Sequence, residues 1–130
     1  MRILVIGGGG REHALTWALT TGRPDVYVVC APGNPGIAEF AKCRPADLTQ
    51  PLDLLAIAEQ EQVDLTVVGP EVPLSAGVAD AFAAAGRPIV GPTRAAAALE
   101  WSKVFAKHFM ARHNVLRVEQ GVREALHGAP

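Results

Sequence analysis

The segment from Ile3 to Ala14 constrains the fold more than any other part of the chain, because it joins a buried strand to a helix through four glycines. Four consecutive aliphatic residues, at 3–6, are typical of a strand in a parallel sheet that is covered on both faces. The glycines at 7–10 allow positive φ and let a ligand contact the backbone. The helix that follows directs its free N–H groups at that ligand. The segment therefore predicts a phosphate-binding strand–loop–helix unit.

Two common phosphate motifs do not match this loop. The dinucleotide fingerprint requires a third glycine where the chain has Glu12 or His13, and the expected second strand ends without the acidic residue that binds a ribose 2′-hydroxyl. No Gly-Lys-Ser or Gly-Lys-Thr closes the loop, which disfavours a P-loop. Arg11 suits a phosphate, and Glu12 suits sugar hydroxyls or an amine. His13 is either a proton carrier or, as we favour, an orienting and partly buried ring.

The composition indicates one globular domain without general affinity for polyanions. The chain has 130 residues, 49% of them hydrophobic, which is enough for a single core. A formal net charge of -1 gives no field that would attract nucleic acid or an anionic membrane, and no apolar run is long enough to span a bilayer. Cys30 and Cys43 have no metal-like spacing and are expected to be reduced thiols, which favours the cytoplasm.

Strands and helices alternate along the rest of the chain. Further strands are expected at 26–30, 64–68 and 89–90, with an uncertain short one within 43–48, and helices at 51–62, 75–85 and 94–113. A strand every 20 to 30 residues predicts an α/β fold, a Rossmann-like doubly wound parallel sheet of about five strands. A short amphipathic helical tail is expected at 116–130.

Two loops rich in proline and glycine follow expected strands, at 31–36 and 69–74. Open α/β sheets bind ligands at the carboxyl ends of their strands. Asn34 can donate and accept a hydrogen bond in the first loop, and Glu71 presents a carboxylate from the second, between two prolines. The alternatives are a plain turn and a solvated carboxylate.

Five motifs occur in order along residues 1–115. They are Gly-Gly-Arg-Glu-His-Ala (9–14), Ala-Pro-Gly-Asn-Pro-Gly (31–36), Asp-Leu-Thr-Val-Val-Gly-Pro-Glu-Val-Pro-Leu (64–74), Gly-Pro-Thr (91–93) and Leu-Glu-Trp-Ser-Lys-Val-Phe-Ala-Lys (99–107). Together they resemble the N-terminal, pre-ATP-grasp domain of the phosphoribosylamine-glycine ligases, also called glycinamide ribonucleotide synthetases. The resemblance implies an ATP-grasp ligase of de novo purine biosynthesis. Such an enzyme joins glycine to 5-phosphoribosylamine, with ATP and magnesium, and releases ADP and phosphate.

The resemblance also implies a set of site residues. The phosphoribosyl substrate would be met by Gly9, Gly10, Arg11, Glu12, Asn34 and Glu71, with Glu71 placed for the ribose hydroxyls. Lys103 is a candidate for contact with ATP phosphate. No catalytic and no metal-binding residue is identified.

The family continues well beyond this length, and its ATP-grasp domain has no counterpart in the 130 residues. We therefore expect the chain to be inactive alone, to bind no cofactor by itself, and to need that missing domain as a partner. Two alternatives stay open. One is a stand-alone nucleotide-binding domain, and the other is a non-catalytic scaffold that forms a homodimer through an apolar stripe of Val118, Val122 and Leu126.

Overall fold

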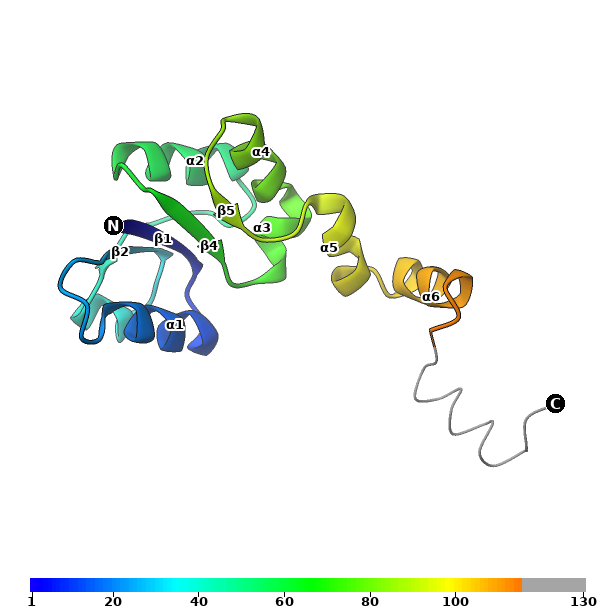
Figure 1. Ribbon diagram of the computed structural model, residues 1–130, viewed down its shortest axis with the longest axis horizontal. Helices are drawn as coiled ribbons and strands as arrows, with labels where there is room; N and C mark the ends of the chain where they lie inside the picture. Colours follow the sequence, from blue (N-terminus) through cyan, green and yellow to red (C-terminus); the bar gives the residue numbers. More distant parts are fainter. Residues whose placement is uncertain (116–130) are drawn as a thin grey trace, which may run out of the picture. The chain divides into compact units, whose positions relative to one another are not determined.

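β1 (Arg2–Gly7) lies at the centre of a parallel sheet in the computed structural model, which describes residues 1–115 (Figure 1). The strand order is β3-β2-β1-β4-β5 and every neighbouring pair is parallel. The other strands are β2 (Tyr27–Pro32), β3 (Lys42–Cys43), β4 (Leu65–Val68) and β5 (Ile89–Val90). The chain moves outward from β1 to β3 and then returns to β4 on the other side of β1. The strand order therefore reverses between β1 and β4, where such sheets bind ligands.

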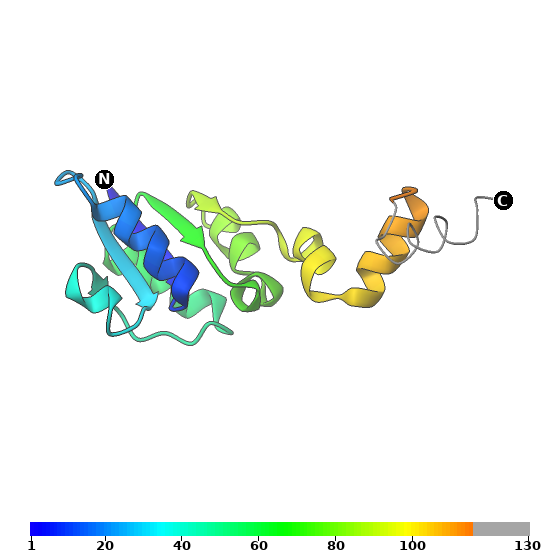
Figure 2. The same ribbon diagram turned by 90° about the horizontal axis from the view of Figure 1, so that it is seen from below.

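Helices cover both faces of this sheet (Figures 1 and 2). α1 (Gly10–Thr20) and the 3-10 helix η1 (Ile37–Glu39) lie on one face, and α2 (Pro51–Gln60) and α4 (Val78–Ala84) lie on the other. This is the predicted doubly wound α/β fold, and its strands lie close to the expected positions. β3 resolves the uncertain third strand, which is only two residues long.

The aliphatic run of β1 supplies both cores, because successive side chains of a strand point to opposite faces. Leu4 and Ile6 pack with α2 and α4, whereas Ile3 and Val5 pack on the side of α1. All four side chains are at most 4% exposed. Both faces of the strand are buried, as the sequence predicted, and this explains why four hydrophobic residues follow one another without a polar one.

Two helices that the sequence predicted as continuous are divided, so those predictions were wrong. The helix expected at 75–85 is α3 (Glu71–Ala76) followed by α4, and Gly77 between them has a left-handed φ of 95°. The helix expected at 94–113 is α5 (Arg94–Trp101) followed by α6 (Lys103–Arg112). Ser102 between these two is extended, and its hydroxyl accepts a 3.3 Å hydrogen bond from the Phe105 N–H. Ser102 is thus an N-cap for α6, a role that competes with a continuous helix.

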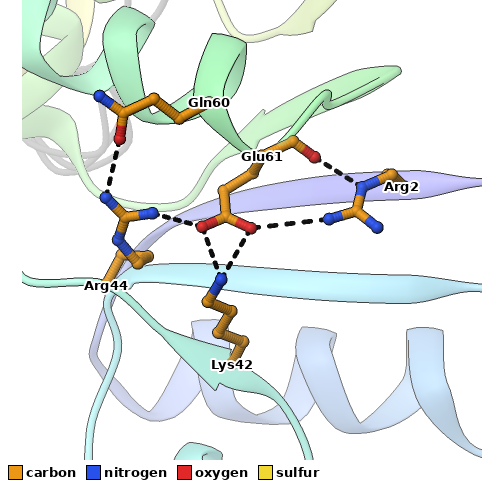
Figure 3. Close-up of polar contacts among 5 residues, drawn as sticks. All are labelled: Arg2, Lys42, Arg44, Gln60 and Glu61. Atoms are coloured by element: carbon orange, nitrogen blue, oxygen red, sulfur yellow. Dashed lines mark hydrogen bonds and ion pairs between the residues drawn. The ribbon is translucent and has the colours of Figure 1, made fainter.

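A buried carboxylate ties three elements together at the amino ends of the strands (Figure 3). The Glu61 side chain, 5% exposed, accepts hydrogen bonds of 2.8 and 3.0 Å from Lys42 Nζ and a further bond from Arg44. Arg2 Nη2 lies 3.6 Å away, and Arg2 Nε donates to the Glu61 carbonyl oxygen. The hydrogen bonds from Lys42, followed by those from Arg44, hold the pKa of Glu61 below its ordinary value despite burial. Glu61 therefore fastens the end of α2 to β1 and β3.

The chain divides into two compact units, and the sheet belongs to the first, Met1–Ala97. The second unit begins at Ala98 and contains α6. Within residues 1–115, no helix is long and apolar enough to cross a membrane. The predicted helical tail and its stripe of Val118, Val122 and Leu126 lie outside the described residues, and the predicted boundary at residue 115 stays a prediction.

Candidate functional site

Three loops meet at the carboxyl ends of β1, β2 and β4. The Gly33 N–H donates to the Gly7 carbonyl oxygen at 3.1 Å, and Asn34 Nδ2 donates to the Gly8 carbonyl oxygen at 2.9 Å. A β-carbon added at Gly8 would overlap the Gly33 carbonyl oxygen. The loop after β1 therefore lies against the loop after β2 with no room for a side chain between them. The predicted substrate residues lie in these loops or in the first turn of the helix that follows: Gly9, Gly10, Arg11, Glu12, Asn34 and Glu71.

Asn34 uses both polar atoms of its side chain within the loops. Besides the bond to Gly8, its Oδ1 accepts a 2.9 Å hydrogen bond from the Ile37 N–H at the start of η1. The sequence placed Asn34 in the crevice as a donor and acceptor. In the structure Asn34 joins the β1 and β2 loops and starts η1, and its contact with the substrate stays a prediction.

Glu12 is buried, at 3% exposure, beneath the glycine loops. Its Oε2 accepts a 2.7 Å hydrogen bond from the Gly9 N–H, while its Oε1 has no hydrogen-bond partner among the described residues. Buried carboxylate oxygens are costly to leave unpaired, and Oε1 is itself buried against Gly69, so it lowers the stability of this loop. The bond to Gly9 also fixes the residue that caps α1.

The first turn of α1 is open to solvent. Gly9 is the N-cap residue, and Gly9, Gly10 and Arg11 are all exposed. A β-carbon added at Gly10 would meet nothing within 4 Å. The free N–H groups and positive end of this helix can therefore be reached by an anion without displacing any side chain.

Arg11 and Glu71 bring the two sides of the strand reversal together. Arg11 Nη2 lies 3.8 Å from Glu71 Oε2, and the two side chains are 74% and 50% exposed. The sequence placed Glu71 in a rigid loop, and this was wrong, because Glu71 is the first residue of α3 and Pro70 is its N-cap. An extended Pro70 still orients the carboxylate toward α1. The site thus combines one fixed cation, one exposed carboxylate and one buried carboxylate.

His13 packs against the loop after β2, whereas Lys103 belongs to the second unit. The half-buried His13 ring packs on Phe40 with a centroid separation of 5.4 Å, and a β-carbon at Gly36 would lie 2.6 Å from His13 Cε1. This packing supports the orienting interpretation of His13. Lys103 is exposed and begins α6 in the second unit. Within residues 1–115, no group of three histidine, cysteine or acidic side chains is placed to hold a metal ion.

The sequence did not reveal that Gly69 makes room for the Glu12 side chain. A β-carbon at Gly69 would overlap Glu12 Oε1, and one at Gly7 would lie 2.6 Å from Glu12 Cγ and 2.8 Å from Pro70 Cδ. Gly7 and Gly69, at the ends of neighbouring strands, together leave the space that the Glu12 side chain fills. The available signal was a glycine directly after each of two buried aliphatic runs, with a glutamate nearby in the first.

Residues 1–100 match the family model of the phosphoribosylglycinamide synthetase N domain. Phosphoribosylamine–glycine ligase of Xylella fastidiosa is 56% identical over 117 residues, which are 88% of this chain and 27% of that protein. The ligase of Xanthomonas campestris is 57% identical over the same length, with the same coverage. The chain thus spans 27% of the length of these relatives.

A solved structure gives the same relationship. The crystal structure of phosphoribosylamine–glycine ligase from Thermotoga maritima superposes with a TM-score of 0.62 at 30% identity, covering 88% of this chain and 25% of that one. The biotin carboxylase domain of a single-chain bacterial carboxylase has a TM-score of 0.65 at 18% identity, and it shares the fold.

Proposed function

Because the chain belongs to the phosphoribosylglycinamide synthetase N-domain family, we propose that it is the substrate-binding domain of a phosphoribosylamine–glycine ligase. The whole ligase would join glycine to 5-phosphoribosylamine at the expense of ATP and form glycinamide ribonucleotide in purine biosynthesis. The part of the relatives that extends beyond this chain would supply the other wall of the site.

One observation carries the assignment of the site. The open first turn of α1, Arg11, and the acceptors of Glu12 and Glu71 converge where the strand order reverses. The backbone N–H groups of Gly10 and Arg11 and the Arg11 guanidinium suit a 5′-phosphate. In this proposal Glu71 would accept from ribose hydroxyls, and Glu12, whose buried carboxylate accepts from the Gly9 N–H, would shape the loop that meets the substrate. Gly9 caps the helix and holds Glu12 in place, and Asn34 holds the loops that frame the ligand.

ATP and magnesium belong, in this proposal, to the remainder of the ligase. The chain covers 27% of the length of its ligase relatives, so in this proposal it binds the sugar phosphate and turnover requires the complete ligase. Lys103 stays a candidate for contact with ATP phosphate. We infer a cytoplasmic location, because both cysteines are free thiols and the cytoplasm keeps thiols reduced. Self-association through 116–130 stays a prediction.

The test is an NMR titration of the ¹⁵N-labelled chain with ribose 5-phosphate, in which the chemical shift of each backbone amide is measured. We expect localised shifts at Gly9, Gly10, Arg11 and Glu71. Arg11→Ala should weaken binding about tenfold, equal to about 1.4 kcal/mol, because it removes the one side-chain cation of the site. Arg23→Ala is the matched control, since Arg23 is also exposed but follows the carboxyl end of α1.

Two results would contradict the proposal. One is a folded chain whose amides at the glycine loop do not move at millimolar ribose 5-phosphate. The other is an equal loss of affinity in Arg11→Ala and Arg23→Ala, which would indicate attraction by net charge and not by this site.

A further inference from the structure

Cys30 and Cys43 are register partners on the neighbouring parallel strands β2 and β3. Neighbouring strands lie about 4.8 Å apart, which falls within the roughly 4.4–6.8 Å between the Cα atoms of natural disulfides. Side chains of register partners stand on the same face of a sheet. Both cysteines accordingly pack in the core on the side of α1. The two thiols are free in this structure.

Because Gly33 has no side chain, the Cys43 sulfur can occupy the space beside Cys30 that a β-carbon at Gly33 would fill. The φ of Gly33 is 75°, and a β-carbon added there would overlap Cys43 Sγ and lie 3.5 Å from Cys30 Cβ. Both cysteines therefore border one small region beneath the loop that follows β2.

The two thiols differ in their access to solvent. Cys30 is fully buried, and burial raises the pKa of its thiol to about 11. Cys43 is partly exposed. The thiolate is the form that reacts with oxidants, so a reagent from solvent meets Cys43 first and Cys30 second.

We propose that Cys30 and Cys43 are a modification site, a thiol pair that a hydroperoxide converts to an intramolecular disulfide. The Cys43 thiolate attacks one oxygen of hydrogen peroxide, the O–O bond breaks, and the departing hydroxide takes a proton to become water. The product is a Cys43 sulfenic acid. Cys30 sulfur then attacks Cys43 sulfur, and the hydroxide that leaves takes the Cys30 proton. Two thiols are oxidised, one peroxide is reduced, and two waters are released.

The disulfide would act on the neighbouring loops, a consequence that rests on the proposed function. Cys30 Sγ donates a 3.2 Å hydrogen bond to the Gly7 carbonyl oxygen, and Cys43 Sγ donates one of 3.8 Å to the Asn34 carbonyl oxygen. A disulfide sulfur carries no proton, so both bonds are lost on oxidation. Gly7 and Asn34 belong to the two loops that frame the sugar-phosphate site, which should therefore bind its ligand more weakly.

The experiment treats the reduced 130-residue chain at low concentration with hydrogen peroxide and follows its intact mass and its free thiols. We expect loss of two hydrogen atoms and of both thiols without added oxygen, reversed by dithiothreitol. Cys30→Ser should instead stop at a Cys43 sulfenic acid that a cyclic diketone traps. Cys43→Ser should leave Cys30 reduced. The oxidised chain should bind ribose 5-phosphate several-fold more weakly, and its affinity should recover on reduction.

Each alternative result overturns a defined part of the proposal. Disulfide-linked dimers, or Cys43 oxidised to sulfinic acid beside a free Cys30, would overturn the intramolecular pair. Equal affinity in both redox states would overturn the link to the loops. Failure of the reduced chain to bind ribose 5-phosphate would contradict the proposed function, while the mass measurement would still decide whether the disulfide forms.

Discussion

Arg11 Nη2 lies 3.8 Å from the Glu71 carboxylate, so the first turn of the helix after β1 contacts the first residue of the helix after β4. Both side chains are largely exposed, and exposed ion pairs contribute only about 0–1 kcal/mol to stability. The pair therefore does little to hold the fold together. It keeps a cation and an acceptor together at the point where the strand order reverses.

Glu71→Gln should separate the binding of the phosphate from the binding of the sugar. The change removes the charge that competes for Arg11, so inorganic phosphate should bind at least as well as before. Ribose 5-phosphate should bind several-fold more weakly, because an amide is a poorer acceptor for hydroxyls than a carboxylate. The free energy of unfolding should change by less than about 0.5 kcal/mol. Isothermal titration with the two ligands and urea unfolding measure these effects.

Equal weakening of both ligands by Glu71→Gln would contradict this division of roles. Glu39→Gln is a suitable control, because Glu39 is another exposed carboxylate, at the end of η1.

Gly7→Ala should lower the stability of the fold, whereas Gly10→Ala should weaken ligand binding and leave the stability intact. At Gly7 the φ is 129° and the new methyl would lie within 2.8 Å of Glu12 and Pro70, so we expect a loss of roughly 2–4 kcal/mol in the free energy of unfolding. At Gly10 the methyl meets nothing, and alanine is the better helix former by up to about 1 kcal/mol. Gly10→Ala should therefore fold at least as well.

The Gly10→Ala chain should still bind ribose 5-phosphate several-fold more weakly, since its methyl occupies the approach to the first turn of α1. Urea unfolding and ligand titration of the two variants test both statements. Unchanged affinity in Gly10→Ala would place the phosphate elsewhere.

Asn34→Ala should destabilise the loops through two lost hydrogen bonds, one to the Gly8 carbonyl oxygen and one from the Ile37 N–H. Each such bond contributes about 0.5–1.5 kcal/mol. Asn34→Asp keeps the acceptor for Ile37 but sets a carboxylate oxygen against the Gly8 carbonyl oxygen, so it should be at least as destabilising as Asn34→Ala. Thermal and urea unfolding give this order. A fully stable Asn34→Ala would mean that the loops hold together without this side chain.

The glycine loop and the buried strand could be read from the sequence because their signals are local. The run at 3–6 is typical of a strand buried on both faces, and the glycines that follow it indicate the loop. The breaks at Gly77 and Ser102 were missed because a glycine or a serine inside a helical pattern is also compatible with a continuous helix. Whether each residue breaks the helix depends on packing and capping, which the local pattern does not contain.

The Glu61 cluster was missed for a different reason. Its members lie in three separate segments, at 2, 42–44 and 60–61, and each reads as an ordinary exposed charge until the strands pair. The unpaired Glu12 oxygen was equally hidden. Sequence indicated a residue suited to a ligand at the helix start, but the space for its side chain is made by Gly69, fifty-seven positions later along the chain.

Glu61→Gln should lower stability in a way that depends on pH. The Lys42 and Arg44 bonds keep the pKa of Glu61 below the ordinary value of 4.5 in the folded chain. Such a group contributes stability that is fully present above its unfolded pKa and is lost as the pH falls through the folded value. The native chain should therefore exceed Glu61→Gln by roughly 1–3 kcal/mol near neutral pH, as expected for hydrogen bonds to charged groups. Below a pH of about 4.5 this difference should shrink. Urea unfolding across this pH range measures the difference in free energy of unfolding, with Glu59→Gln, at an exposed glutamate, as control. A difference that does not depend on pH would mean that packing, and not charge, explains the role of Glu61.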